Sequence, residues 1–282
     1  MRLLDKLTAA RATLIAAGVP PGDAANDVDL FARRILGWDR VRLITDQTED
    51  APPALEPRFS EWIDRRAHRE PTTYIVGLRE FWGLDFEVTP DVLIPRPETE
   101  FIVEEALPLL AAMAEPRIAD IGTGCGCLAV TLAHESPRAQ VVASDLSAPA
   151  LEVARQNAVR HGVADRVTLV HTSYLDGIAG PFDLVVSNPP YVRDLDKPAL
   201  SREVRHEPDV ALFGGGDGLR DVAGVLDTAI RTLRPGGWFL MEFGYGQDDS
   251  VRAFVADRTA LRLERIRDDL QGIPRTAIIQ RL

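Results

Sequence analysis

The chain has 282 residues, of which 45% are hydrophobic and 27% charged, and its formal net charge is −11. This is an ordinary soluble globular composition, long enough for one large core and a smaller one. No run approaches the ~18 apolar residues of a membrane span, and no secretory signal opens the chain. The acidic balance argues against nonspecific nucleic-acid binding, and the two neighbouring cysteines, Cys125 and Cys127, are too few for a zinc site. We therefore expect a cytoplasmic protein with no metal, no membrane contact and no direct nucleic-acid partner.

Helical periodicity dominates the first part of the chain. Apolar residues recur at helical spacing in three segments, 3–15, 23–36 and 55–69. Asp23 is the predicted N-cap of the second helix, and Gly37 is expected to end it. Residues 1–72 are therefore predicted to form a small helical bundle. The bundle is equally compatible with a stabilising cap and with a module that docks a partner.

Two short strands are predicted next, over residues 81–88 and 91–94, around a turn at Thr89-Pro90-Asp91. They make a hairpin within a linker, 73–97, that joins the helical bundle to the rest of the chain.

From Pro116 onward, strands alternate with helices. Strands are predicted over 117–121, 140–145, 166–170, 182–186, 236–243, 261–266 and 277–281, and helices over 128–134, 148–161, 219–233 and 249–256. Repeated strand–helix units predict an α/β domain, residues 98–282, whose mostly parallel sheet carries helices on both faces. Ligands of such sheets bind beyond the carboxyl ends of the strands.

A glycine loop follows the first of these strands. It runs from Asp120 to Cys127 with the spacing G-x-G-x-G, and Asp145 ends the next strand. Glycines allow close approach of the backbone to a ligand, and an acid at the second position accepts hydrogen bonds from ribose hydroxyls. These features indicate a nucleoside cofactor. The loop lacks the G-x-G-x-x-G spacing of a dinucleotide dehydrogenase, which favours S-adenosylmethionine without excluding the alternative.

The run Ser187-Asn188-Pro189-Pro190-Tyr191 follows a later strand directly. A planar amino group attached to a carbonyl or an aromatic ring is a poor nucleophile, because its lone pair is delocalised. Two fixed acceptors at its N–H groups favour the charge that develops as it attacks a methyl group, and the Asn188 side-chain oxygen and the Pro189 carbonyl are suited to that task. Tyr191 adds an apolar wall. The motif thus predicts methyl transfer to a conjugated amino group, of either a protein amide or a nucleobase.

The sequence resembles the protein-(glutamine-N5) methyltransferases that act on release factors, the PrmC/HemK group, over essentially its whole length. Four stretches carry the resemblance: Tyr74–Gly77 with Glu80–Leu84, the V-L-I-P-R-P-E-T-E string of 92–100, the 122–126 loop with Asp145 and Asn157, and the Asn188–Tyr191 motif with its downstream partner Glu207–Gly215. The I-P-R-P-E-T-E string distinguishes this group from enzymes that methylate a ribosomal-protein glutamine.

The resemblance implies a Rossmann-like class I methyltransferase with a seven-stranded sheet and S-adenosylmethionine as cofactor. The implied substrate is the glutamine of the Gly-Gly-Gln loop of class I peptide-chain release factors, whose methylation supports translation termination. Implied cofactor contacts are Asp120, Gly122, Thr123, Gly124, Cys125, Gly126, Asp145, Leu146, Tyr174 and Asn188. Implied catalytic residues are Asn188, Pro189, Pro190 and Tyr191, which also bind the substrate together with Arg96 and Glu98.

Some roles stay open at this point. Ser173 stands where the family often has an acid near the adenine, so the hydrogen bond to the adenine amino group is expected to be weaker or supplied by another group. Tyr174 keeps the aromatic contact there. Arg96 is suited either to the cofactor carboxylate or to a nearby acid, Glu98 to helix entry or to substrate, and Glu207 to a supporting contact or to the surface. The rival functions are a nucleic-acid amino-methyltransferase, a ribosomal-protein glutamine methyltransferase and a catalytically silent interaction protein. A monomer is expected.

Overall fold

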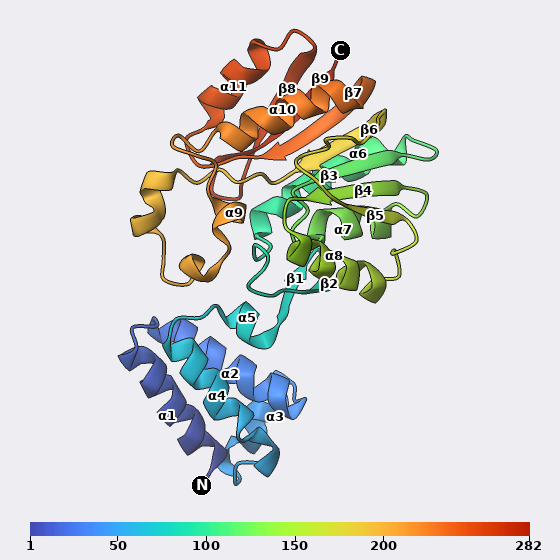
Figure 1. The fold of residues 1–282 in the computed structure, drawn as a ribbon. Coiled ribbons are helices and arrows are strands. Elements are labelled where there is room, and N and C mark those ends of the chain that lie inside the picture. Colours follow the sequence, from blue (N-terminus) through green and yellow to red (C-terminus); the bar gives the residue numbers. More distant parts are fainter. The chain divides into compact units, whose positions relative to one another are not determined.

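A computed structural model describes residues 1–282, and the chain forms two compact units (Figure 1). The first comprises Met1–Gly77 and Ser201–His206, and the second comprises Leu78–Leu200 and Glu207–Leu282.

The first unit is a helical bundle. Its α-helices are α1 (Leu3–Ala16), α2 (Pro21–Leu36), α3 (Arg40–Thr45), α4 (Arg58–Ala67) and α5 (Thr72–Val76), with 3-10 turns η1 (Asp46–Thr48), η2 (Pro53–Leu55) and η5 (Val204–His206). The three predicted helices are confirmed as α1, α2 and α4. Gly37 ends α2 in the left-handed conformation at φ 66°, as predicted. Asp23 is not the N-cap, because Pro21 already occupies the first turn, where its missing N–H costs nothing.

Apolar faces of α1, α2 and α4 form the core of this bundle, and the ring of Phe31 packs edge-on against Trp62 with 5.3 Å between centroids. A buried ion pair crosses it. The Arg66 guanidinium donates to Asp27 at 2.7 Å and to Glu203 at 3.0 Å, and Arg69 donates to the same glutamate at 2.7 Å. Glu203 belongs to the short 201–206 segment, which carries no sequence pattern that would assign it to this unit.

The predicted hairpin exists in the second unit, but its turn was predicted in the wrong place. Strands β1 (Leu78–Phe81) and β2 (Leu84–Glu87) pair antiparallel and turn at Trp82-Gly83, not at Thr89-Pro90-Asp91, so the second predicted strand is not formed. Trp82 and Gly83 have φ values of 54° and 72°, the left-handed pair that two-residue hairpin loops require. The tryptophan hid this turn from the sequence, because a bulky residue rarely takes a positive φ.

The left-handed conformation of Gly83 predicts how a substitution there changes the free energy of unfolding. Nothing lies within 4 Å of a Cβ added there, so Gly83→Ala adds only backbone strain. We expect the free energy of unfolding to fall by about 1 kcal/mol. Gly216→Ala is the matched control, because that glycine has equal space without a positive φ. Urea unfolding of both variants measures the difference, and equal stability of the two would contradict the assigned strain.

The second unit is built on a seven-stranded sheet with the order β5-β4-β3-β6-β7-β9-β8 (Figure 1). Its strands are β3 (Arg117–Ile121), β4 (Gln140–Asp145), β5 (Val167–His171), β6 (Phe182–Ser187), β7 (Leu233–Glu242), β8 (Leu261–Asp268) and β9 (Pro274–Arg281). Its helices are α6 (Glu100–Ala111), α7 (Cys127–Glu135), α8 (Ala148–Arg160), α9 (Asp209–Leu212), α10 (Arg220–Thr232) and α11 (Asp248–Ala256), with 3-10 turns η3 (Pro97–Thr99) and η4 (Asp194–Ala199). Strands β3 to β7 run parallel and β9 antiparallel, which confirms the predicted mostly parallel sheet.

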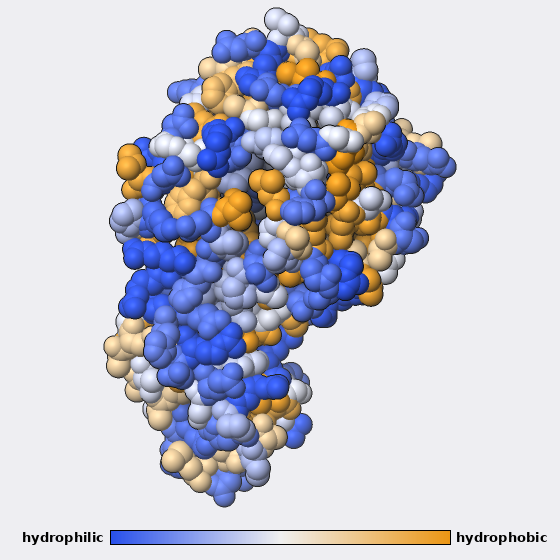
Figure 2. All heavy atoms as spheres, viewed as in Figure 1, coloured by the Kyte–Doolittle hydropathy of each residue, from blue (hydrophilic) through white to orange (hydrophobic).

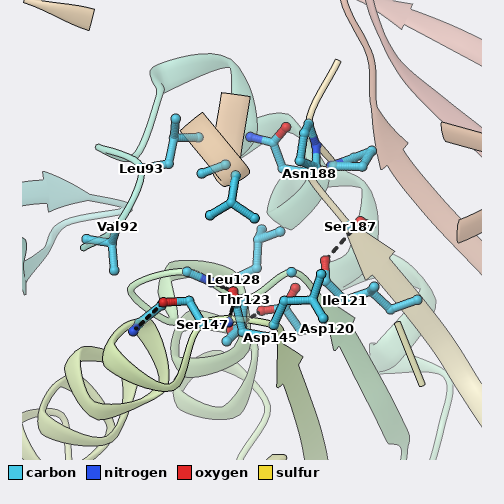
Figure 3. A pocket seen from close by; sticks show the side chains of 18 of the residues that line it. Val92, Leu93, Asp120, Ile121, Thr123, Leu128, Asp145, Ser147, Ser187 and Asn188 are labelled. Atoms are coloured by element: carbon cyan, nitrogen blue, oxygen red, sulfur yellow. Dashed lines mark hydrogen bonds between the residues drawn. The ribbon is translucent and has the colours of Figure 1, made fainter. Parts of the chain in front are cut away.

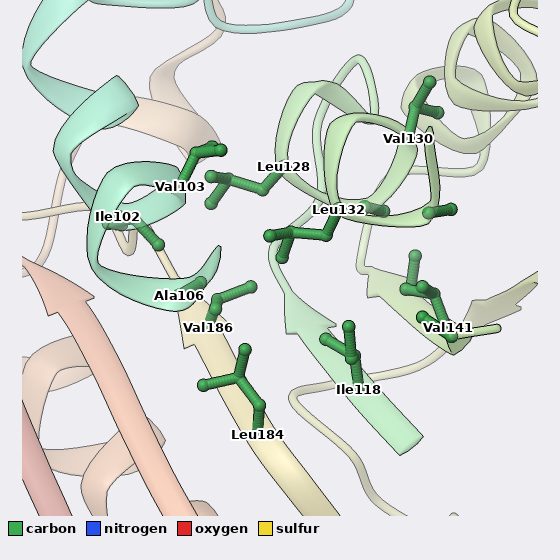
Figure 4. Close-up of a cluster of buried hydrophobic side chains, with 14 of the residues drawn as sticks. Ile102, Val103, Ala106, Ile118, Leu128, Val130, Leu132, Val141, Leu184 and Val186 are labelled. Atoms are coloured by element: carbon green, nitrogen blue, oxygen red, sulfur yellow. The ribbon is translucent and has the colours of Figure 1, made fainter. Parts of the chain in front are cut away.

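Helices cover both faces of this sheet. Alternate residues of the strands face opposite ways, so Ile118 packs with α6 and α7 whereas its neighbour Ala119 packs with α10 and α11. Figure 4 shows the first of these cores, with Leu132 of α7 among the strand residues. The two cores fix the sheet between its helices, so the loops at the strand ends are held on a rigid base. None of the helices combines the length and apolar composition needed to cross a bilayer.

Candidate active site

A cavity lies at the carboxyl ends of the parallel strands (Figure 3). Ile121, Asp145 and Ser187, the last residues of β3, β4 and β6, all line it. The loops that follow β3 and β4 lie on one side of the cavity, and the loop that follows β6 lies on the other. This is where the topology of a doubly wound sheet predicts a ligand.

The glycine loop after β3 gives the cavity an open floor. Gly122 and Gly124 have φ values of 71° and 55°, and no atom lies within 4 Å of a Cβ added at either. The loop therefore leaves room for a ligand against its backbone. Gly126 differs, since a Cβ there would lie 3.1 Å from Cβ of Ala154. Gly126 therefore packs against α8. Of the predicted cofactor contacts in this loop, Thr123 and Cys125 line the cavity and Gly126 does not.

Asp120 joins this loop to the helix after it. Its Oδ2 accepts hydrogen bonds from the Thr123 hydroxyl at 2.6 Å and from the Ala129 N–H, in the first turn of α7, at 3.1 Å. Its Oδ1 is buried and has no hydrogen-bond partner in the chain. Burial raises the pKa of this carboxyl to about 7, and the charge of Asp145 contributes to the rise. A residue that lines the cavity thus carries a buried carboxyl oxygen without a hydrogen-bond partner in the chain.

Asp145 ends β4 as the sequence predicts. Its two oxygens accept from the N–H groups of Gly124 at 2.9 Å and Ser147 at 2.8 Å, so the carboxylate ties the glycine loop to the start of α8. Each oxygen keeps a lone pair for a further donor. Burial raises the pKa of this carboxyl. Leu146 beside it lines the cavity and is 58% exposed.

Tyr174 lines the cavity in a strained backbone conformation, with φ 48°. Its hydroxyl donates to Asp221 at 2.8 Å, and burial raises the pKa of this phenol to about 12. A Cβ at Gly224 would lie 2.4 Å from the hydroxyl oxygen, so a side chain there would displace the ring. Thr172, not Ser173, lines the cavity at this point.

The Asn-Pro-Pro-Tyr run leaves β6 at the opposite wall. Asn188 is half-buried, and its Nδ2 donates to the Thr99 hydroxyl at 3.1 Å. Asn188, Pro189 and Pro190 line the cavity, whereas Tyr191 points its hydroxyl to Glu242 at 3.0 Å. No donor of the chain is hydrogen-bonded to Oδ1 of Asn188 or to the carbonyl oxygen of Pro189. Two acceptors are thus free on the wall of the cavity opposite the glycine loop.

The backbone after Pro190 is held by close contacts. A Cβ at Gly214 would lie 2.5 Å from the Pro190 carbonyl oxygen, and one at Gly218 would lie 2.3 Å from that of Tyr191. Gln247 donates to the Tyr191 carbonyl at 3.1 Å. A side chain at Gly214 or Gly218 would therefore displace these carbonyl groups of the catalytic loop.

Arg96 and Glu98 do not line the cavity. Arg96 donates to Oε1 of Glu207 at 2.6 Å, and the Ile94 N–H donates to Oε2 at 3.0 Å. Glu207 is buried, so of the roles left open by the sequence it takes the supporting one, and Arg96 meets a nearby acid. The pair fixes the segment that carries Thr99.

Several lining residues were not predicted as site residues. Among them are Val92, Leu93, Thr99, Ser147, Ala150, Thr172, Asp221 and Val225. Thr99 lies inside the quoted 92–100 string, so the sequence offered a signal there. Asn157, quoted for the resemblance, lies outside the cavity and ties the hairpin to the loop, donating to the carbonyls of Glu87 at 3.0 Å and Cys125 at 2.8 Å.

A parallel sheet with an open glycine loop after β3, an acid at the end of β4 and an Asn-Pro-Pro-Tyr run after β6 defines a class I methyltransferase. Two family models agree: "Methyltransferase small domain" matches residues 100–220, and "PrmC N-terminal domain" matches residues 5–77. A solved methyltransferase from Pyrococcus furiosus shares the fold, with a TM-score of 0.53 and 21% identity over 77% of this chain and 98% of that one.

Full-length relatives narrow the class to one family. A "Release factor glutamine methyltransferase" from Bradyrhizobium diazoefficiens is 42% identical over 265 residues, 92% of this chain and 89% of the relative. One from Deinococcus radiodurans is 39% identical over 272 residues, covering 96% of each chain. The chain belongs to the release factor glutamine methyltransferase family.

Proposed function

We propose that the protein transfers a methyl group from S-adenosylmethionine to the side-chain amide nitrogen, N5, of the glutamine in the Gly-Gly-Gln motif of a class I peptide-chain release factor. Family membership supports the activity and the substrate class. The observation that carries the chemistry is the pair of free acceptors, Asn188 Oδ1 and the Pro189 carbonyl, in the cavity that the open glycine loop also lines. We propose a monomeric, cytoplasmic enzyme.

The cavity suits this cofactor. The carboxylate of Asp145 has lone pairs for the ribose hydroxyls, and the bare backbone of Gly122 and Gly124 allows the amino-acid part to lie close. The partnerless Oδ1 of Asp120 suits an ammonium group, and the ring of Tyr174 offers a flat apolar contact to a base. The cofactor, when bound, supplies a methyl group on a sulfonium centre.

The residues of the chain then act on the glutamine amide. Asn188 Oδ1 and the Pro189 carbonyl each accept one of its N–H groups, which favours the pyramidal, positively charged nitrogen of the transition state. A bound cofactor would supply the methyl group to this nitrogen, and the methylated nitrogen would then lose one proton to water while Asn188 and Pro189 hold its orientation. No strong base is needed, because a protonated amide nitrogen is very acidic. The chain therefore contributes positioning and fixed dipoles.

Two substrates distinguish this proposal from its nearest rival. The purified enzyme is incubated with tritiated S-adenosylmethionine and either a release factor or DNA. We expect label in the factor and none in the DNA. Label in the DNA alone would favour the nucleic-acid rival, and absence of cofactor binding by calorimetry would favour a silent interaction protein.

We further propose that the helical unit docks the folded release factor. It has a core of its own, and it includes the 201–206 segment, which the chain reaches soon after the catalytic loop. Figure 2 shows hydrophilic residues over much of the visible face of this unit. The whole factor is therefore expected to be methylated with a kcat/KM at least about ten times that of a short Gly-Gly-Gln peptide. Equal values for the factor and the peptide would contradict the docking role.

The raised pKa of Asp120 predicts a pH dependence of cofactor binding. An ammonium group pairs with the ionised carboxylate, which is present above a pKa of about 7 and is lost as the pH falls through that value. Affinity is therefore expected to be about threefold weaker near pH 6.5 than near pH 7.5. Calorimetry at both pH values measures it. In Asp120→Asn the difference should vanish, and an unchanged pH dependence in that variant would assign it to another group.

A further inference from the structure

A chain of hydrogen bonds runs behind the catalytic loop. Nδ2 of Asn188 donates to the Thr99 hydroxyl at 3.1 Å, and that hydroxyl donates to Oε2 of Glu242 at 2.6 Å. The other oxygen, Oε1, accepts from the Tyr191 hydroxyl at 3.0 Å. Thr99 is 2% exposed and Glu242 1%, so water does not replace these partners. This series of hydrogen bonds joins three separate segments: the turn before α6, the end of β7 and the catalytic loop.

The carboxyl group of Glu242 determines which group donates and which accepts in each of these hydrogen bonds. Both hydroxyls donate to Glu242, Thr99 to Oε2 and Tyr191 to Oε1, so the carboxyl group is the acceptor of both bonds. Thr99 has a single hydroxyl proton, which is thereby committed, and its oxygen can only accept from Asn188. Only the NH2 side of the asparagine amide can make that bond. The amide is therefore fixed with Oδ1 turned away from Thr99.

Packing alone gives no reason for this carboxyl. Burial raises the pKa of Glu242 and the charge of Glu98 raises it further, while the two hydroxyl donors and the charge of Arg275 act against the rise. A buried ionisable group is expensive, and an apolar residue of similar volume often serves stability as well or better. A role in orienting the side chain of Asn188 would explain why a carboxyl group is buried at position 242.

We propose that Thr99 and Glu242 are positioning residues for methyl transfer, which orient the Asn188 amide so that its Oδ1 accepts from the substrate amide. The inference rests on the proposed function of Asn188. Neither residue needs to touch the reacting atoms. Both act through the asparagine.

Thr99→Val tests the proposal kinetically, because valine keeps the shape and removes the hydroxyl. We expect kcat to fall at least ~10-fold, with the KM for the release factor within about threefold of the wild type. Thr99→Ser keeps the hydroxyl and should restore most of the turnover. Thr131→Val is the matched control, because Thr131 is also fully buried and its hydroxyl has no partner. Wild-type kcat in Thr99→Val would overturn the proposal.

Glu242→Gln tests the donor and acceptor roles in the hydrogen bonds that connect Glu242, Thr99 and Asn188. A carboxamide can donate to Thr99, which frees the threonine proton for Oδ1 of Asn188 and allows the amide to reverse. We expect a loss of kcat similar to that of Thr99→Val. In an Asn188→Ala background, each change should add less than about twofold further loss, because residues that act as one unit are not additive. Full additivity would show that the two residues act independently of Asn188.

A spectroscopic measurement tests the same contact without any substrate. The chain has three asparagines, Asn26, Asn157 and Asn188, so selective 15N labelling resolves their side-chain amides. We expect Thr99→Val to shift the Asn188 Nδ2H2 signals and speed their exchange, while those of Asn157 stay unchanged. Unmoved Asn188 signals would contradict the proposal even if the wild type methylates release factors. Conversely, a shift in an enzyme that leaves the factor unlabelled would reject the proposed function and keep the hydrogen-bond chain.

Discussion

Asn188→Ala is expected to lower kcat at least ~10²-fold, the scale of removing one fixed dipole from a transition-state site. The variant loses the Oδ1 acceptor, so one N–H of the substrate amide has no partner as charge develops on its nitrogen. Its Nδ2 bond to Thr99 is lost as well. Affinity for S-adenosylmethionine should change little, because Asp120, Asp145 and the glycine loop are untouched.

Single-turnover kinetics with the release factor measure this loss directly. Calorimetric titration of the variant with the cofactor is the control for folding and binding. Asn157→Ala is a poor comparison, because that asparagine holds the hairpin against the loop. Normal turnover in Asn188→Ala with intact cofactor binding would contradict the two-acceptor mechanism.

Asp145→Ala is expected to weaken cofactor binding by about 10- to 100-fold, as expected for the loss of hydrogen bonds to a charged group. Two effects combine. The ribose hydroxyls lose their acceptor, and the N–H groups of Gly124 and Ser147 lose the carboxylate that orders the loop. Asp145→Asn keeps one carbonyl acceptor and should lose less.

Asp165→Ala provides the matched control for charge, because this aspartate is exposed and lies outside the cavity. Its cofactor affinity should equal that of the wild type. Calorimetry at one pH and salt concentration compares the three variants. Equal affinity in Asp145→Ala and Asp165→Ala would remove Asp145 from the cofactor site.

The larger elements of the fold could be predicted from the sequence because their apolar patterns are long and regular. The strand Arg117–Ile121 and the helix over 148–160 lie within a residue of their predicted positions. Short elements could not be predicted. The helices Thr72–Val76 and Asp209–Leu212 have too few residues to show a period, and they form because tertiary contacts support them. The hairpin turn was missed because its first residue is Trp82.

Candidate site residues could be predicted where they sit in loops directly after strands. Gly122, Gly124, Asp145 and Asn188 all line the cavity for that reason. The residues behind them could not be predicted, because folding alone brings them together. Thr99 and Glu242 are 143 positions apart in the chain and share a 2.6 Å hydrogen bond. No spacing in the sequence signals such a pair, although each lies beside a recognisable element.

Methylation of the glutamine side-chain nitrogen of a release factor can be detected by tandem mass spectrometry. The Gly-Gly-Gln peptide is analysed after purified enzyme, cofactor and factor have been incubated together. We expect one added methyl group on that glutamine, and none when Asn188→Ala replaces the wild type for the same short time. A methyl group on another residue, or an unmodified peptide from wild-type enzyme that binds its cofactor, would contradict the claim.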